Sequence, residues 1–197
     1  MKWDTNFERR HGLIMGVDEV GRGCLAGPVV SCAVVMPAGV YIQGVRDSKK
    51  LSAKKREQLA HRIRANALAI GIGVVSPEEI DRIGIRKAVQ QTMKIACEEI
   101  IAKRVYPGAI CVDYETVPTP WPQASVIRGD ATIYQVACAS IVAKVYRDQM
   151  AASWEEKYPG YFFGQNKGYG TKAHKEGIFN LGLTPIHRRS FCKFWSE

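Results

Sequence analysis

Four carboxylates share one position in the pattern of the chain, because each lies at or just past the end of an apolar run typical of a β-strand. They are Asp18, Glu19, Asp113 and Asp130. Ligand sites in open α/β sheets gather beyond strand ends. If the four converge, they form an oxygen-rich cluster of like charges that is costly without a cation, and hard ions such as Mg²⁺ prefer oxygen ligands. Two such ions about 3.5–4 Å apart commonly assist in-line displacement at phosphorus, and the pattern is compatible with that chemistry.

The same acids also have structural explanations. Asp130 precedes a predicted helix and is a good N-cap, and Asp113 before Tyr114 could close a turn. The pair Asp18-Glu19 is harder to explain in this way, because two adjacent acids between apolar strands belong to neither face. Since periodicity does not show whether the acids converge, both interpretations stay open.

A glycine-rich run follows the first two acids. GRGCLAG (21–27) spaces its glycines one residue wider than a dinucleotide-binding fingerprint, and a strand rather than a helix follows it. It also lacks the Lys-Ser/Thr pair of a P-loop, so a nucleotide cofactor is disfavoured. The run indicates either a bare backbone that a phosphodiester can approach beside Arg22, or a tight turn with positive φ. Both can hold together.

Charge points to an anionic partner. The 197 residues contain 28 Lys and Arg against 19 Asp and Glu, a net charge of +9, which suits nucleic acid. DSKKLSAKKR (47–56) concentrates five basic residues and Ser48 for phosphate contacts, although a solvated helix face explains it equally well. NKGYGTKAHK (166–175) carries Tyr169 in a basic loop, where it could stack on a base or sugar, or fill a small core. His174 and His187 are phosphate neighbours or structural residues rather than general bases.

The strands expected to position these residues are 13–20, 28–37, 67–76, 109–115 and 125–129. Ser52 caps a basic helix over 52–67, and a capping box at SPEE (76–79) opens a helical stretch to about Arg104, broken near Gly84. A further helix runs from about 132 to 154. The first three strands are antiparallel, and the order indicates a mixed sheet covered by helices. We expect one domain, 1–197, in which about 155–197 form a smaller portion of helices and loops with an irregular sequence pattern.

Cysteine usage and hydropathy suggest a cytoplasmic protein. The six cysteines form no C-x-x-C pair and several lie in apolar runs. The N-terminal residues show no apolar signal region, and no segment approaches the roughly 20 apolar residues of a membrane span.

Together these stretches resemble type 2 ribonuclease H, the ribonuclease HII family. The motifs run in family order: GVDEVGRGCLAGPVV (16–30), DSKKLS (47–52), VD (112–113), GDA (129–131), ASIVAKVYRD (139–148), GYGTKAH (168–174) and HRRSF (187–191). The likeness covers residues 14 to 191. It departs from the family at Val20, Cys24 and Tyr114, none of which is a carboxylate of the motifs, and Tyr114 could crowd the site.

The resemblance implies a ribonuclease H-like α/β fold, a mixed five-stranded sheet flanked by helices with a small helical C-terminal portion. It assigns catalysis and the binding of Mg²⁺ or Mn²⁺, with two ions during catalysis, to the four carboxylates. It assigns recognition of the ribonucleotide 2′-hydroxyl to Gly21, Arg22 and Gly23, and stacking on the next sugar to Tyr169. Further nucleic-acid contacts are expected from Ser48, Lys49, Lys144 and Arg147.

The function implied is an endoribonuclease that hydrolyses RNA in RNA–DNA hybrids and cuts 5′ of single ribonucleotides in duplex DNA. It would leave 3′-hydroxyl and 5′-phosphate ends and initiate ribonucleotide removal. We expect a monomer with no membrane contact and no evident sliding-clamp peptide. Two rivals stay open, a non-catalytic nucleic-acid binder and a DNA-cutting nuclease on the same fold.

Overall fold

A five-stranded mixed sheet forms the centre of the protein, in the order β3-β2-β1-β4-β5. The computed structural model describes residues 6–195. The strands are β1 (Ile14–Val20), β2 (Val29–Val35), β3 (Ala69–Val75), β4 (Ala109–Asp113) and β5 (Gln123–Val126). The helices are α1 (Asn6–His11), α2 (Ala53–Asn66), α3 (Pro77–Ile83), α4 (Ile85–Ala102), α5 (Gly129–Thr132), α6 (Tyr134–Lys157), α7 (Phe163–Asn166) and α8 (Lys172–Leu181). Short 3₁₀ turns occupy Ser48–Lys50, Arg189–Phe191 and Lys193–Trp195.

The sheet combines an antiparallel meander of three strands with two strands that are added in parallel. β1 pairs antiparallel with β2, and β2 antiparallel with β3, as expected for strands this close in sequence. β4 lies parallel to β1, and β5 parallel to β4. The expected mixed sheet is therefore confirmed, and β1 lies in its middle, where both faces are buried.

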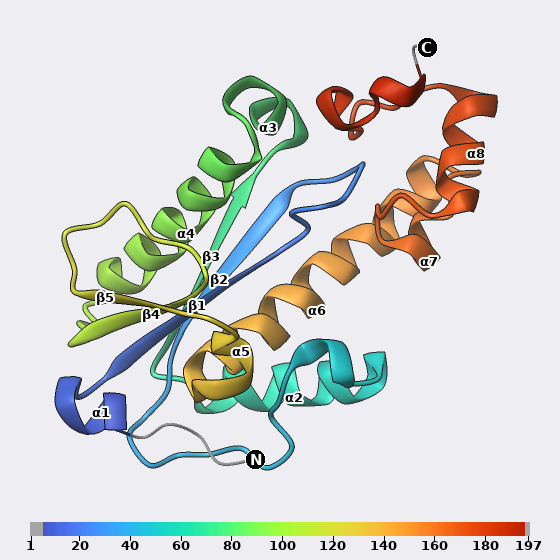
Figure 1. The fold of residues 1–197 in the computed structure, drawn as a ribbon. Coiled ribbons are helices and arrows are strands. Elements are labelled where there is room, and N and C mark those ends of the chain that lie inside the picture. Colours follow the sequence, from blue (N-terminus) through green and yellow to red (C-terminus); the bar gives the residue numbers. More distant parts are fainter. Residues whose placement is uncertain (1–5, 196–197) are drawn as a thin grey trace.

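Helices cover both faces of this sheet (Figure 1). Alternate side chains of β2 separate accordingly, with Val30, Cys32 and Val34 in the apolar cluster shared with α2 and α6. Val29 and Val35 face the opposite way, toward α4. This period of two is what a strand buried on both faces requires.

Helix α6 approaches β1 very closely, and the closeness depends on a glycine. A Cβ atom at Gly16 would lie 2.1 Å from the carbonyl carbon of Gln135 and 2.3 Å from the backbone nitrogen of Val136. No side chain fits there. The absence of one lets the first turn of α6 rest against the strand two residues before Asp18, which fixes the spacing between strand and helix at the site.

Local signals explain most helix boundaries. Ser52 and Ser76 accept hydrogen bonds from the backbone amides of Lys55 and Glu79, as N-caps should. The Glu79 carboxylate bonds Arg82 instead of returning to Ser76, so the capping box is only half formed. The predicted break falls at Gly84, whose φ of 83° ends α3 before α4 begins.

The chain beyond α6 is more regular than its composition suggests. It contains α7 and α8, which pack with the end of α6 and with the glycine-rich loop through Ala26, Trp154, Phe163 and Ile178. Figure 1 shows this portion at the far end of α6, away from β4 and β5. Among the described residues, no helix is both long and apolar enough to cross a bilayer.

Candidate active site

Three elements carry the four predicted acids to one end of the sheet. Asp18 and Glu19 lie inside the end of β1, opposite Cys32 and Ser31 of β2. Asp113 is the last residue of the neighbouring strand β4, and its Oδ1 accepts a hydrogen bond of 2.9 Å from the amide of Gly129. That bond joins β4 to α5, which contains Asp130.

The structure decides between the two explanations of Asp130. It does not cap α6, because that helix follows Ile133 and has no side-chain cap. Asp130 instead lies in the single turn of α5 and lines a cleft with Asp113. The predicted single helix from about residue 132 is replaced by this turn and by α6, and the turn directs the fourth acid toward the strand ends.

Electrostatics show that the four acids act on one another. Burial is the main cause that raises the pKa of Asp18, Glu19 and Asp130, and the Asp113 carboxylate raises the pKa of each of the three further. For Asp18 the shift is large, since this side chain is enclosed and Glu19 adds repulsion, only partly offset by a hydrogen bond with Ser140. A group that raises three other pKa values must lie within electrostatic reach of all of them, so Asp113 interacts with each of the other three acids.

The donor set fits a hard divalent cation. It offers carboxylate oxygens only, and its mutual repulsion is the cost that a cation would remove. Within residues 6–195, no three His, Cys, Asp or Glu side chains are already gathered to hold an ion. The structure thus shows an assembled set of donors and not a finished coordination sphere.

The first of two clefts at the acids brings the specificity candidates together. It has a volume of about 240 Å³ and is lined by Asp18, Glu19, Val20, Gly21, Arg22, Gly23, Ser48, Lys49, Asp113, Ser140, Lys144 and Tyr169. Three of the four acids, the whole GRG segment and the predicted stacking tyrosine therefore share one space. Of the predicted contact residues, only Arg147 is missing from this lining.

The position of Arg147 corrects the expectation that it contacts nucleic acid. Its side chain is fully buried, and it donates to the carbonyl oxygens of Ala26, Pro28 and Lys167 at 2.6–3.0 Å. A guanidinium used in this way has no surface left for a phosphate. Arg147 is a positioning residue that ties the glycine-rich loop to the loop before Tyr169, and sequence alone could not separate these roles.

A second buried arginine, Arg188 of the HRRSF motif, holds the same loop. It donates to the carbonyl oxygens of Gly27 and Arg22 at 2.9 and 3.0 Å, and its own amide donates to Leu25. Burial lowers the pKa of Arg188 to about 10, and its Nη2 is buried with no hydrogen-bond partner. Burying a guanidinium costs free energy unless its N–H groups are hydrogen-bonded. Two of the N–H groups of Arg188 bond to the loop, and these bonds offset part of that cost. The sequence signal was present, since HRRSF closed the series of motifs without a role.

The GRG segment forms the tight turn that was one of its two predicted roles. Gly21 has a φ of 90°, and a Cβ there would lie 2.3 Å from Nε of Arg147, so the tight-turn explanation holds for it. The Arg22 guanidinium lies 3.6 Å from carboxylate oxygens of both Glu19 and Glu115. Glu115 is a buried acid that the sequence analysis did not single out, and it orients Arg22 from beneath.

Tyr169 is held from behind by a chain of two histidines. The Thr184 amide donates to Nδ1 of His187 at 2.9 Å, so the ring proton of neutral His187 lies on Nε2. Nε2 of His187 lies 3.0 Å from Nε2 of His174, whose Nδ1 donates to the Tyr169 carbonyl at 2.9 Å. The chain requires both rings to be neutral, and burial lowers both pKa values, that of His187 to about 4. Of the two roles considered for these histidines, phosphate neighbour or structural residue, these contacts are those of a structural residue.

Three further predicted contacts line the first cleft, and two of them, Ser48 and Lys144, are also engaged within the protein. Ser48 is buried and its hydroxyl lies 2.9 Å from that of Ser140, which supports Asp18; this favours a positioning role over phosphate binding. Lys144 donates to Asp148 at 2.7 Å and lies 5.6 Å from the centre of the Tyr169 ring. Lys49 is exposed and lines both clefts.

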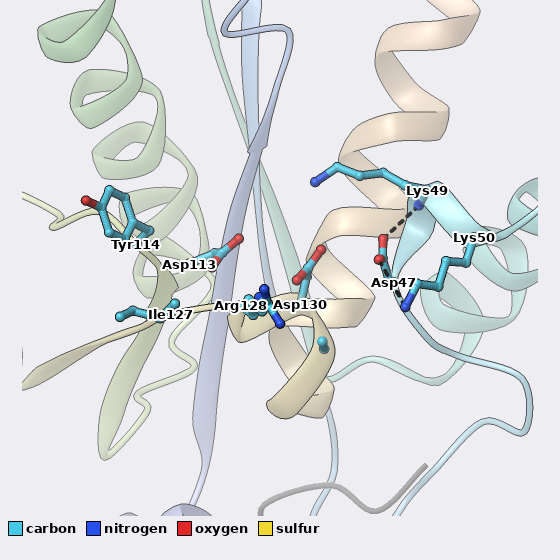
Figure 2. A pocket seen from close by; sticks show the side chains of 9 residues that line it. Asp47, Lys49, Lys50, Asp113, Tyr114, Ile127, Arg128 and Asp130 are labelled. Carbon is cyan, nitrogen blue, oxygen red and sulfur yellow. Dashed lines mark hydrogen bonds and ion pairs between the residues drawn. The ribbon is translucent and has the colours of Figure 1, made fainter.

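The second cleft, of about 490 Å³, opens on the other side of Asp113 (Figure 2). Figure 2 shows Asp113 and Asp130 between Tyr114 and Ile127 on one side and Asp47, Lys49 and Lys50 on the other. The Asp47 carboxylate accepts from the Lys49 amide and pairs with Lys50 at 4.0 Å. Asp113 and Lys49 line both clefts, so the two spaces meet at the acids.

A mixed five-stranded sheet with four carboxylates at one strand end, in two clefts that also carry lysines and arginines, is typical of an α/β nuclease of the ribonuclease H type. The family model described as Ribonuclease HII matches residues 15–194, so the chain belongs to the ribonuclease HII family. It is therefore a ribonuclease H hydrolase, an endoribonuclease that acts on RNA–DNA substrates.

Individual relatives agree with this assignment. The chain is 50% identical to Ribonuclease HII of Alkaliphilus oremlandii over 192 residues, which cover 96% of this chain and 93% of the relative. It is 48% identical to Ribonuclease HII of Enterococcus faecalis over 189 residues, 96% of this chain and 73% of that one. A ribonuclease HII from Archaeoglobus fulgidus, solved in a complex with PCNA, has a TM-score of 0.75 at 26% identity, covering 91% of this chain and 94% of that one.

Proposed function

We propose that the protein cuts duplex DNA on the 5′ side of an embedded ribonucleotide and hydrolyses RNA in longer hybrids, leaving 3′-hydroxyl and 5′-phosphate ends. The observation that carries the proposal is that three of the four acids share the 240 Å³ cleft with the GRG segment and Tyr169. Groups suited to cleavage and groups suited to recognising a ribose thus face the same substrate position. Cleavage at this position would start the removal of the ribonucleotide.

Asp18, Glu19, Asp113 and Asp130 would hold Mg²⁺ or Mn²⁺. When bound, a pair of these ions activates water and stabilises the leaving 3′-oxygen. The protein contributes a fixed donor set, because β1, β4 and α5 are joined by pairing and by the Gly129–Asp113 bond. Lys49 and Lys144 line the cleft where the phosphate would pass.

Discrimination of RNA from DNA would come from the GRG backbone, since the 2′-hydroxyl is the group that differs. Gly23 is the informative position. A Cβ atom there would meet no protein atom within 4 Å, and its φ is not in the left-handed range. Folding therefore does not require glycine at 23, whereas close approach of a ribose would.

The Gly23→Ala variant tests this assignment. We expect unchanged unfolding and a loss of roughly tenfold or more in cleavage at a single ribonucleotide. Gly164→Ala is the matched control, because its Cβ would make only ordinary contact with Glu155, at 3.6 Å. Equal junction cleavage by both variants would remove the GRG backbone from substrate recognition.

Asp18→Asn separates the enzyme from its rivals. A non-catalytic binder would behave identically with and without the substitution, and a DNA nuclease would cut an all-DNA duplex. We expect the variant to bind a one-ribonucleotide duplex without cutting it. A monomeric state and a cytoplasmic location stay predictions, and we propose no clamp contact for this chain.

A further inference from the structure

Two largely exposed apolar side chains lie next to the carboxylates of the site. Tyr114 is 75% exposed and Ile127 is 73% exposed, and both line the 490 Å³ cleft with Asp113 and Asp130. Figure 2 shows them on the wall opposite Lys49 and Lys50. Both side chains therefore offer apolar surface to anything that enters this cleft.

Packing and backbone preference do not explain the tyrosine. Tyr114 has a φ of 54°, in the left-handed region where a residue with a Cβ is disfavoured. The backbone N–H of Tyr114 donates a hydrogen bond of 3.3 Å to the carbonyl oxygen of Val126, a bond that any residue except proline could make. Unusual backbone conformations of this kind gather at functional sites. The side chain is therefore held outward by a conformation that the fold itself does not favour.

Tyr114 also stands in a defined relation to Tyr169. Tyr169 is 39% exposed and lines the first cleft, and Tyr114 lines the second. The two clefts meet at Asp113 and Lys49, which line both. An exposed aromatic ring thus lies on each side of the acids, one per cleft.

We propose that Tyr114, supported by Ile127, is a second stacking surface for the nucleic-acid substrate, which contacts a base or sugar on the side of the scissile phosphate away from Tyr169. The inference rests on the proposed function. The same cleft carries three basic residues beside its three acids, and the side chains of Lys49, Lys50 and Arg128 suit contact with a phosphate backbone. Aromatic side chains stack on any base, and aliphatic ones can pack against unstacked steps.

Binding by a non-cutting protein tests the proposal. In an Asp18→Asn background, we expect Tyr114→Ala to raise the Kd for a one-ribonucleotide duplex about tenfold, the usual effect of losing one stacked base. Tyr114→Phe keeps the ring and should bind like the parent. Tyr114→Gly relieves the backbone and should bind as weakly as Tyr114→Ala. Tyr106→Ala is the control, because Tyr106 is 59% exposed but stacks on Trp121 outside both clefts.

Position is tested with 2-aminopurine placed on either side of the ribonucleotide. We expect Tyr114→Ala to change the fluorescence of one flank and Tyr169→Ala that of the other. Parent-like affinity of Tyr114→Ala, or an effect of both variants on the same flank, would overturn the proposal. Failure of the proposed function looks different, because the protein with Asp18 intact would then leave the one-ribonucleotide duplex uncut whatever residue 114 is.

Discussion

The histidine chain behind Tyr169 predicts a measurable loss of stability in mild acid. His187 is buried, and its pKa is lowered from an ordinary 6.5 to about 4. Between those values the unfolded chain binds a proton that the folded protein does not. The free energy of unfolding therefore falls as the pH falls through this window. From pH 8 to pH 5 this amounts to about 2 kcal/mol for His187 alone, and His174, shifted in the same direction, adds to it.

The assay is urea unfolding at pH 8 and pH 5 for the wild type and His187→Gln, which retains a donor toward His174 and does not titrate. Comparing the two proteins is essential, since the raised pKa values of Asp18, Glu19 and Asp130 act in the opposite direction in both. We expect His187→Gln to be less stable at pH 8 and to lose about 2 kcal/mol less on acidification. Equal losses in the two proteins would refute the neutral hydrogen-bonded chain.

Three further substitutions test the framework of the site. Arg188→Met should lower the free energy of urea unfolding by about 2 kcal/mol, because two charge-assisted hydrogen bonds are lost while one unpaired buried nitrogen is removed. The variant of its exposed neighbour, Arg189→Met, should change the same free energy by less than about 0.5 kcal/mol. Similar losses in both variants would show that Arg188 does not hold the glycine-rich loop. Asp18→Asn should abolish cleavage yet raise the unfolding free energy of the metal-free protein at neutral pH, since a buried carboxyl group with a raised pKa destabilises the fold at pH values where it is ionised; a destabilised variant would contradict this sign. Gly16→Ala should cost about 3 kcal/mol or more by forcing β1 away from the backbone of Gln135, and a wild-type melting temperature would show that the contact is not needed.

Local sequence signals predicted much of the fold. Ser52, Ser76 and Gly84 mark helix boundaries where the structure has them, because caps and glycine breaks depend on a few neighbouring residues. The antiparallel order of the first three strands followed from short connections. The turn of α5 was not predicted, because an aspartate shortly before a helix has the local sequence pattern of an N-cap. Only the hydrogen bond from Gly129 to Asp113, which joins residues distant in sequence, distinguishes a turn at Asp130 from a cap.

Site residues were predictable by type and less so by role. The acids could be found from their place at strand ends, and the structure adds that Asp113 lies within reach of the other three. Arg147 was expected to contact nucleic acid because it matches a basic residue of the family motif ASIVAKVYRD, but tertiary packing buries it against three carbonyl oxygens. Glu115 was missed because a single acid after a strand carries no distinguishing signal.

The central claim is that one cleft combines carboxylate-dependent cleavage with recognition of a ribose. Mapping the cut on a DNA duplex with a single ribonucleotide, first with Mg²⁺ and then with Mn²⁺, tests it most directly. We expect one product boundary on the 5′ side of the ribonucleotide, a 3′-hydroxyl and a 5′-phosphate, and no cleavage of the matched all-DNA duplex. Cleavage of the all-DNA duplex, or cuts distributed without regard to the ribonucleotide, would contradict the account.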